Sequence, residues 1–151
     1  MIDNEKPDVI CFNETKLQSD LYLDNYWSYQ TMFQRKGGCW TAAKNSQNVR
    51  LQLVKALGSY LCWTRLTTGP IQVQILNCYL EGGDSLYNKN RALRVIEIVH
   101  DILRQDVNAA IVVCGDFNNH QPTIDYQLSK LNFIPSLRSD IATHKFGNQL
   151  D

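Results

Sequence analysis

The chain has 151 residues, 44% hydrophobic and 20% charged, which excludes a disordered tail and allows one buried core. Fifteen basic side chains balance fifteen acidic ones. The chain therefore lacks the overall positive charge that would indicate nucleic-acid binding. No apolar run approaches the ~20 residues of a membrane span, and the polar start lacks a secretory signal's apolar core; we therefore expect an intracellular protein, nuclear or cytoplasmic, with no membrane partner.

The first half of the chain predicts β-strands. An apolar run at 9–12 is typical of a buried strand, and Gly37-Gly38 predicts a turn into a second strand at 39–42. Residues 49–54 alternate between apolar and polar side chains, as a half-exposed strand does.

A hairpin gives the clearest β signal. Residues 60–66 and 71–80 are strand-like, and Thr68-Gly69-Pro70 forms the turn between them.

Helical periodicity begins after the hairpin. Residues 90–105 predict a helix whose inward face is Ala92, Leu93, Ile96, Val99 and Leu103. The apolar run 109–114 predicts another buried strand. A second helix is expected after Pro122, with Thr123 as its N-cap and with Ile124, Leu128 and Leu131 facing inward.

Interleaved helices and strands, several of them in adjacent hairpins, predict an α/β fold. We expect a mixed-sheet α/β sandwich, with two packed β-sheets flanked by helices, rather than a purely parallel sheet. The sequence has no repeat or linker-like stretch, so we expect residues 1–151 to form a single domain.

Five cysteines are scattered through apolar stretches without a C-x-x-C pair. They are Cys11, Cys39, Cys62, Cys78 and Cys114. We interpret all five as buried thiols that act as small hydrophobic side chains, rather than as disulfide or catalytic residues.

Side chains that could bind a metal ion or a phosphate follow three of the predicted strands. Glu14 follows the first strand, Tyr79 ends the hairpin, and Asp116 and Asn118 follow the run before Gly115. In an extended backbone, the i, i+2 spacing of Asp116 and Asn118 points both the same way. Each residue alone is more often a turn, cap or core residue, but together they suit a hard divalent cation and a phosphate oxygen.

Four segments in order resemble the endonuclease/exonuclease/phosphatase superfamily. Residues 7–16 (PDVICFNETK) resemble its P-D-I-(I/L)-x-L-Q-E-T-K segment, and residues 115–118 (GDFN) resemble its G-D-(F/L)-N motif. Residues 143–151 are similar to its T-x(n)-(R/Q)-(I/L)-D segment. Residues 35–38 (RKGG) are similar to the glycine-rich strand entry of endonucleases from non-LTR retrotransposons.

The resemblance implies a role for five residues. It makes Glu14 the ligand of Mg²⁺ (or Mn²⁺), Asp116 the carboxylate that orients or deprotonates the attacking water, and Asn118 the amide that holds this water or the phosphate. Tyr79 is implied to hydrogen-bond the scissile phosphate, and Asp151 to orient a catalytic histidine.

The implied function is Mg²⁺-dependent phosphodiester hydrolysis. The E-T-K and RKGG segments favour endonucleolytic cleavage of DNA, rather than RNA, as part of a retroelement endonuclease–reverse transcriptase or an abasic-site endonuclease. Hydrolysis of this kind builds negative charge on phosphate oxygens, which a cation and fixed donors stabilise.

The sequence departs from the family pattern at both ends and at Asn13. A metal-binding Asn before residue 7 and an Asp-His after Asp151 are missing, so we expect this piece alone to have weak or no nuclease activity. We also expect its incomplete sheet edges to need self-association or a partner. Asn13 replaces the usual Gln, as a shorter amide that could still hold the neighbouring strand.

None of the three histidines has the right place to substitute for the missing one. We expect His100 at the boundary of its helix, His120 on a loop surface and His144 in a structural role.

Other functions stay open at this point. One is a catalytically impaired relic, or pseudoenzyme, that serves as a binding scaffold. Another is a phosphatase or RNA deadenylase of the same superfamily. A calcineurin-like phosphoesterase is disfavoured, because no Asp is followed two places later by His.

Overall fold

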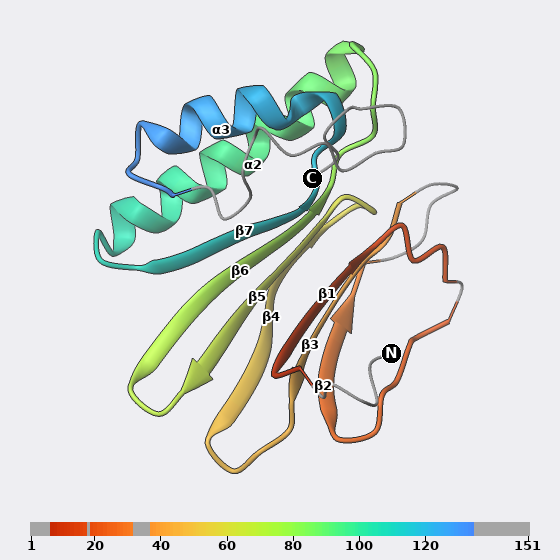
Figure 1. Cartoon of the computed structure of the whole chain (residues 1–151), viewed down its shortest axis with the longest axis vertical. Coiled ribbons are helices and arrows are strands. Elements are labelled where there is room, and N and C mark those ends of the chain that lie inside the picture. Colours follow the sequence, from red (N-terminus) through yellow and green to blue (C-terminus); the bar gives the residue numbers. More distant parts are fainter. Residues whose placement is uncertain (1–6, 18, 32–36, 135–151) are drawn as a thin grey trace.

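The computed structural model describes residues 7–17, 19–31 and 37–134. Two β-sheets pack face to face, and two helices cover the outer side of the larger sheet (Figure 1). This arrangement confirms the expected mixed α/β sandwich. Within the described residues the helices lie over one sheet only.

The smaller sheet is antiparallel and has the order β1-β3-β2. Its strands are β1 (Val9–Asn13), β2 (Tyr26–Gln30) and β3 (Cys39–Lys44). β3 is buried along almost its whole length, because it is the central strand and also faces the other sheet. β2 has no counterpart among the predicted strands.

The larger sheet has the order β4-β5-β6-β7. Its strands are β4 (Val49–Leu57), β5 (Leu61–Thr68), β6 (Ile71–Tyr79) and β7 (Ala110–Asp116). The first three form antiparallel hairpins, as predicted, whereas β6 and β7 are parallel. A parallel pair needs a crossover, which helix α2 supplies. The carboxyl ends of β6 and β7 therefore lie at the same edge.

Helix α2 (Leu86–Gln105) begins earlier than the periodicity predicts. Ser85 caps it by accepting a hydrogen bond from the Asn88 amide (3.2 Å). Leu86 and Tyr87 are exposed and so give no helical pattern. The buried face consists of Asn88, Ala92, Val95, Ile96, Ile98, Val99 and Ile102. Leu93, predicted to face inward, is 48% exposed, so that prediction is wrong.

Helix α3 (Gln121–Ser129) continues directly from a 3-10 turn at Asn118–His120. Thr123 therefore lies inside the helix, and its prediction as N-cap is wrong. Pro122 occupies the first turn, where a missing N–H leaves no bond unmade. None of the helices that the structure describes is both long and apolar enough to cross a membrane.

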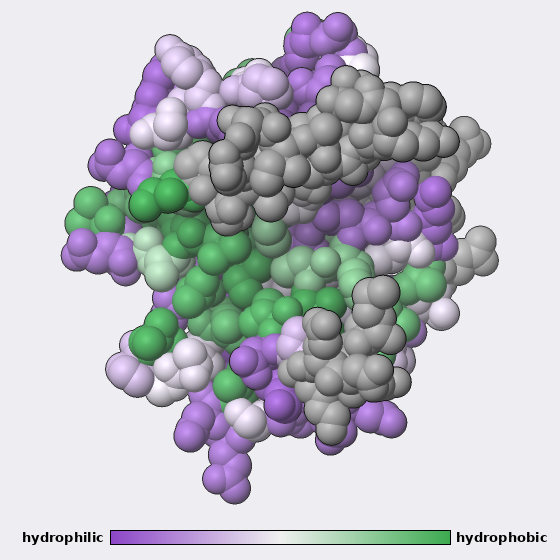
Figure 2. Space-filling model, in the orientation of Figure 1, coloured by the Kyte–Doolittle hydropathy of each residue, from purple (hydrophilic) through white to green (hydrophobic). Residues whose placement is uncertain are grey.

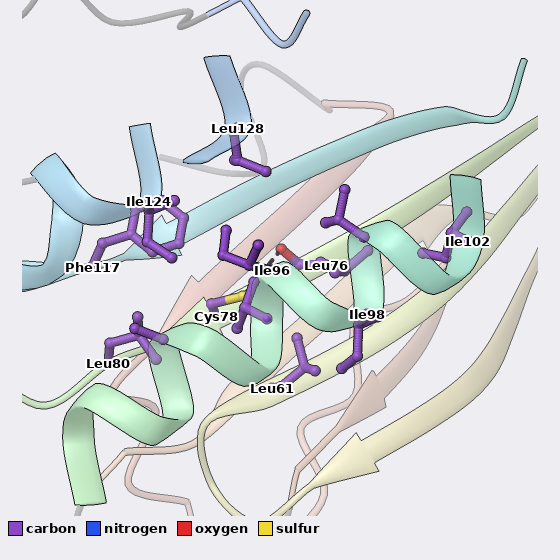
Figure 3. Packing of buried hydrophobic residues seen from close by; sticks show 13 residues of the cluster. Leu61, Leu76, Cys78, Leu80, Ile96, Ile98, Ile102, Phe117, Ile124 and Leu128 are labelled. Atoms are coloured by element: carbon purple, nitrogen blue, oxygen red, sulfur yellow. Dashed lines mark hydrogen bonds between the residues drawn. The ribbon is translucent and has the colours of Figure 1, made fainter. Parts of the chain in front are cut away.

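The main core lies between the helices and the larger sheet. Ile124 and Leu128 of α3 are buried there, as predicted. Figure 3 shows them with Ile96 of α2, gathered over Leu76 and Cys78 of β6. This packing fixes the crossover helix on the sheet and so positions the ends of β6 and β7.

β1 and β7 are edge strands within the described part of the chain. Val9 and Phe12 of β1 are 37% exposed, and Val112 of β7, expected in a buried strand, is 46% exposed. Figure 2 shows hydrophobic side chains gathered in the region that β1, β6 and β7 occupy in the same view of Figure 1. Coverage of these edges by a partner or a second copy stays a prediction.

The helix face can be tested with two substitutions on α2. Ile98→Ala empties a buried site and should lower the free energy of unfolding by about 2–5 kcal/mol. The control Leu93→Ala should change it by no more than about 0.5 kcal/mol, because this side chain is half exposed. Urea unfolding followed by circular dichroism measures both. A larger loss for Leu93→Ala than for Ile98→Ala would contradict the observed face.

Candidate active site

Three of the predicted site residues meet where β1, β6 and β7 end. Tyr79 and Asp116 are register partners on the parallel strands β6 and β7, and the Leu80 amide donates to the Asp116 carbonyl (2.8 Å). Glu14 directly follows β1 on the facing sheet. The Tyr79 hydroxyl donates to Glu14 Oε1 at 2.7 Å. Two separate strand ends therefore bring Glu14 and Asp116 to one tyrosine, Glu14 by a hydrogen bond and Asp116 as its register partner.

Asn118 joins this group through a turn rather than through an extended strand. Asp116 Oδ1 accepts hydrogen bonds from the Asn118 amide (3.1 Å) and from its Nδ2 (2.6 Å). Asn118 has a left-handed backbone (φ 49°), and its Nδ2 also donates to the Leu80 carbonyl (3.0 Å). The predicted proximity is observed, but the extended backbone assumed for it is not. The turn holds the amide against the carboxylate.

Gly115 allows β6 and β7 to approach closely just before Asp116. Its φ is 133°, and a Cβ at this position would overlap the Cys78 carbonyl of the neighbouring strand. Only glycine fits both conditions. The glycine of the GDFN motif therefore has a structural reason independent of any chemistry.

The loop that carries Glu14 packs against the glycine pair before β3. The Thr15 and Lys16 amides donate to the Gly38 and Gly37 carbonyls (both 3.3 Å). Gly38 has φ 100°, and a Cβ there would lie 2.5 Å from Thr15 Oγ1. Within the RKGG segment, the glycines thus hold the Glu14 loop in place; 35–36 lie outside the described residues.

The site keeps Tyr79 protonated. The side chain is only 7% exposed, and its burial, followed by its hydrogen bond to Glu14, raises the pKa of the phenol above its ordinary value. A protonated phenol is a hydrogen-bond donor. Lys16 Nζ lies 3.9 Å from Glu14 Oε1, with both side chains about half exposed. Glu14 therefore faces solvent with two donors beside it.

A buried amide pair ties the strand ends together across the two sheets. Asn77 is fully buried, and its Nδ2 lies within 3.0–3.2 Å of the Trp40 carbonyl, the Phe12 carbonyl and Thr41 Oγ1. In the orientation that satisfies its neighbours, Asn13 donates to Asn77 Oδ1 (2.8 Å) and accepts from the Asp116 amide (3.1 Å). The shorter amide at position 13 thus does hold the neighbouring strands, as expected.

The histidines lie differently from the predictions. His120 is buried, and its Nε2 lies 3.2 Å from the Glu81 carbonyl, so its prediction as a loop-surface residue is wrong. His100 is half-buried on α2, as a boundary residue should be. Asp151 and His144 lie outside the described residues.

The carboxylates fit a hard divalent cation in chemistry but form only part of a site. Glu14 is exposed, and only its Oε1 is engaged within the described residues. Asp116 likewise engages only its Oδ1 there. The described ranges contain no cluster of three potential metal ligands. Glu14 could therefore hold a cation only with further oxygen ligands from water, a phosphate or other parts of the chain.

Sequence reasoning missed an anchor for the loop after Tyr79. The Arg91 guanidinium lies between the rings of Tyr60 (4.9 Å) and Tyr87 (4.2 Å) and pairs with Glu81 (3.3 Å). No local pattern reveals this contact. Asn77 was also missed, although a polar residue inside the apolar run ILNCY is a usable signal.

Comparisons with known proteins place the chain in a family. The model of the Endonuclease/Exonuclease/phosphatase family matches residues 1–148. No curated protein matches the sequence significantly.

Similar solved structures share the fold. They include the 3' phosphatase NExo from Neisseria bound to product DNA hairpin (15% identity, TM-score 0.60, 86% of this chain and 63% of that one). Truncated TDP2 from Caenorhabditis elegans is similar as well (16% identity, TM-score 0.55, 80% of this chain and 53% of that one). Humanized TDP2 from D. rerio is also similar (13% identity, TM-score 0.52, 89% of this chain and 61% of that one). The chain thus spans between 53% and 63% of these structures.

The amide pair can be tested by stability. Asn77→Leu keeps a similar volume but removes the buried amide's hydrogen bonds to the Trp40 carbonyl and from the Asn13 amide, so it should cost about 3 kcal/mol. The control Asn48→Leu is at an exposed turn and should cost less than about 0.5 kcal/mol. Urea unfolding at equilibrium gives both values. Equal stability of the two variants would show that the pair is not needed.

Proposed function

This chain belongs to the endonuclease/exonuclease/phosphatase family, and we propose that its strand ends form the site of a divalent-metal-dependent phosphodiester hydrolysis. One observation carries the proposal: Tyr79 bridges the ends of two sheets, bonded to Glu14 and in register with Asp116. A donor phenol bonded to one carboxylate and in register with a second, which has an amide at 2.6 Å, suits a phosphate and an attacking water.

Each residue of the group has a distinct proposed role. Glu14 would hold Mg²⁺, or Mn²⁺, which supplies positive charge against the phosphate oxygens. The Asp116 carboxylate accepts a proton from the attacking water, and Asn118 Nδ2 fixes that carboxylate. The Tyr79 hydroxyl turns from Glu14 to a phosphate oxygen. Asp151 keeps its proposed role of orienting a histidine.

DNA is the proposed substrate class, ahead of RNA. The E-T-K and RKGG segments support an endonuclease, in a retroelement endonuclease–reverse transcriptase or in abasic-site repair. The NExo structure is bound to a DNA hairpin, which supports the same class by analogy of fold. An intracellular location, nuclear or cytoplasmic, belongs to this proposal.

A binding scaffold is the second candidate. The described residues lack a cluster of three metal ligands, which favours a protein that keeps the sandwich without turnover. Metal binding and nicking separate the two candidates.

Metal binding can be followed by tryptophan fluorescence. Trp40 stacks on Phe12 (5.4 Å between ring centres), two residues before Glu14, so its emission should report on the Glu14 loop. Titration with Mg²⁺ or Mn²⁺ should saturate, and Glu14→Gln should weaken the apparent affinity at least about tenfold. The control Glu97→Gln on α2 removes an exposed carboxylate and should bind like the wild type. Equal affinity in all three proteins would contradict the proposed ligand.

Turnover can be tested by nicking of supercoiled plasmid. We expect slow, Mg²⁺-dependent nicking that Asp116→Asn reduces by about 10²–10⁴-fold, because the proton acceptor is lost. The control Asp101→Asn, at an exposed pair on α2, should retain the wild-type rate. Nicking unaffected by Asp116→Asn would refute the assigned role. Nicking by the wild type above the rate of Asp116→Asn would exclude the scaffold.

A further inference from the structure

Cys11 and Cys114 lie next to each other, one on each sheet. Cys11 of β1 is in register with Thr41 of β3, and Cys114 of β7 is in register with Asn77 of β6. Thr41 and Asn77 are joined directly across the interface, Asn77 Nδ2 donating to Thr41 Oγ1 at 3.2 Å. The register partners of the two cysteines are therefore in contact.

The side chains of both cysteines point into the interface between the sheets. Successive side chains of a strand alternate between its two faces, so Cys11 shares a face of β1 with Asn13. Asn13 reaches across to accept a hydrogen bond from the Asp116 amide, two residues after Cys114. The two strands approach each other with Cα atoms within 8 Å. The thiols thus face one another along the same line of contact.

The pair differs from the three other cysteines. Both thiols are half-buried, whereas Cys39, Cys62 and Cys78 are completely buried. A hydrogen bond from the Cys114 thiol lowers the pKa of Cys11 below its ordinary value, while burial raises the pKa of Cys62 to about 12. A thiolate is the nucleophile in thiol–disulfide exchange, so Cys11 should react first.

We propose that Cys11 and Cys114 form a redox modification site, which small-molecule disulfides oxidise to an internal disulfide between the two sheets. This proposal is independent of the proposed hydrolysis. It also revises the interpretation of all five cysteines as buried thiols, for these two only.

The oxidation takes place in two exchange steps. The Cys11 thiolate attacks one sulfur of the small disulfide, forms a mixed disulfide and releases one thiolate. Cys114 then loses its proton and attacks Cys11 Sγ, which forms the Cys11–Cys114 bond and releases the second thiolate. The protein loses two electrons, the small disulfide gains them, and the thiol protons pass to the released thiolates.

Geometry makes the bond feasible. A disulfide needs an S–S length of about 2.05 Å and Cα atoms about 4.4–6.8 Å apart, and Cα atoms of β1 and β7 already come within 8 Å of one another. Both are edge strands in the described sheets and have a strand neighbour on one side only. Once formed, the bond would fix the two sheets together two residues before Asp116 and three residues before Glu14.

Peptide mapping of the whole chain tests the proposal. The protein is incubated with oxidised glutathione, alkylated and digested with trypsin, which places the five cysteines on five different peptides. We expect one cross-link, between 1–16 and 105–130, with the other three cysteines alkylated. A single chain two hydrogen masses lighter shows that the bond is internal. Dithiothreitol should reverse it.

Single substitutions give the order of attack. In Cys114→Ser, Cys11 should accumulate as the mixed disulfide with glutathione, whereas in Cys11→Ser, Cys114 should stay mostly reduced. The control Cys62→Ser should keep the cross-link. A different pairing, a disulfide between two chains, or alkylation of both cysteines after oxidation would overturn the proposal. The wild-type map alone decides this even if a variant fails to fold.

Discussion

The buried carboxamide of Asn77 is the interaction on which the geometry of the molecule depends. It is completely buried between two sheets and contacts backbone or side chain on both β1 and β3. An amide without partners in such a place would be strongly unfavourable, so its hydrogen bonds favour the arrangement in which the two sheets meet here. Through Asn13 the same network reaches the Asp116 amide. The positions of the strand ends therefore follow from a hydrogen-bond requirement in the core.

Much of the fold could be read from local patterns. The hairpin of β5 and β6 and the strand before GDFN follow from apolar runs and turn residues, which depend only on neighbouring positions. The proximity of Glu14, Tyr79 and Asp116 was also predicted, because all three lie at the carboxyl ends of strands. Such ends can meet at one edge of a sandwich. The chemical roles of these residues stay predictions, and so does Asp151, which lies outside the described residues.

The rest depends on tertiary contacts that no local pattern encodes. β2 (YWSYQ) was missed because its sequence shows no clear alternation of apolar and polar side chains. Only its pairing with β3 in the structure identifies it as a strand. The start of α2 was misplaced because Leu86 is exposed and only the Ser85 cap marks the N-terminus of the helix. His120 was placed on the surface because its burial comes from packing against the loop at Glu81. Hydrophobic periodicity reports burial, not capping or side-chain partners.

The contacts of Arg91 couple the stability of the loop after Tyr79 to the stability of helix α2. The guanidinium is clamped between a ring from the β4–β5 turn and a ring from α2 while it pairs with Glu81. Asn88 of the same helix also bonds the Gly82 carbonyl (3.1 Å). The first turns of α2 and this loop should therefore open together, in one local unfolding event. The loop beside the proposed site then has the local stability of the crossover helix rather than that of the sheet.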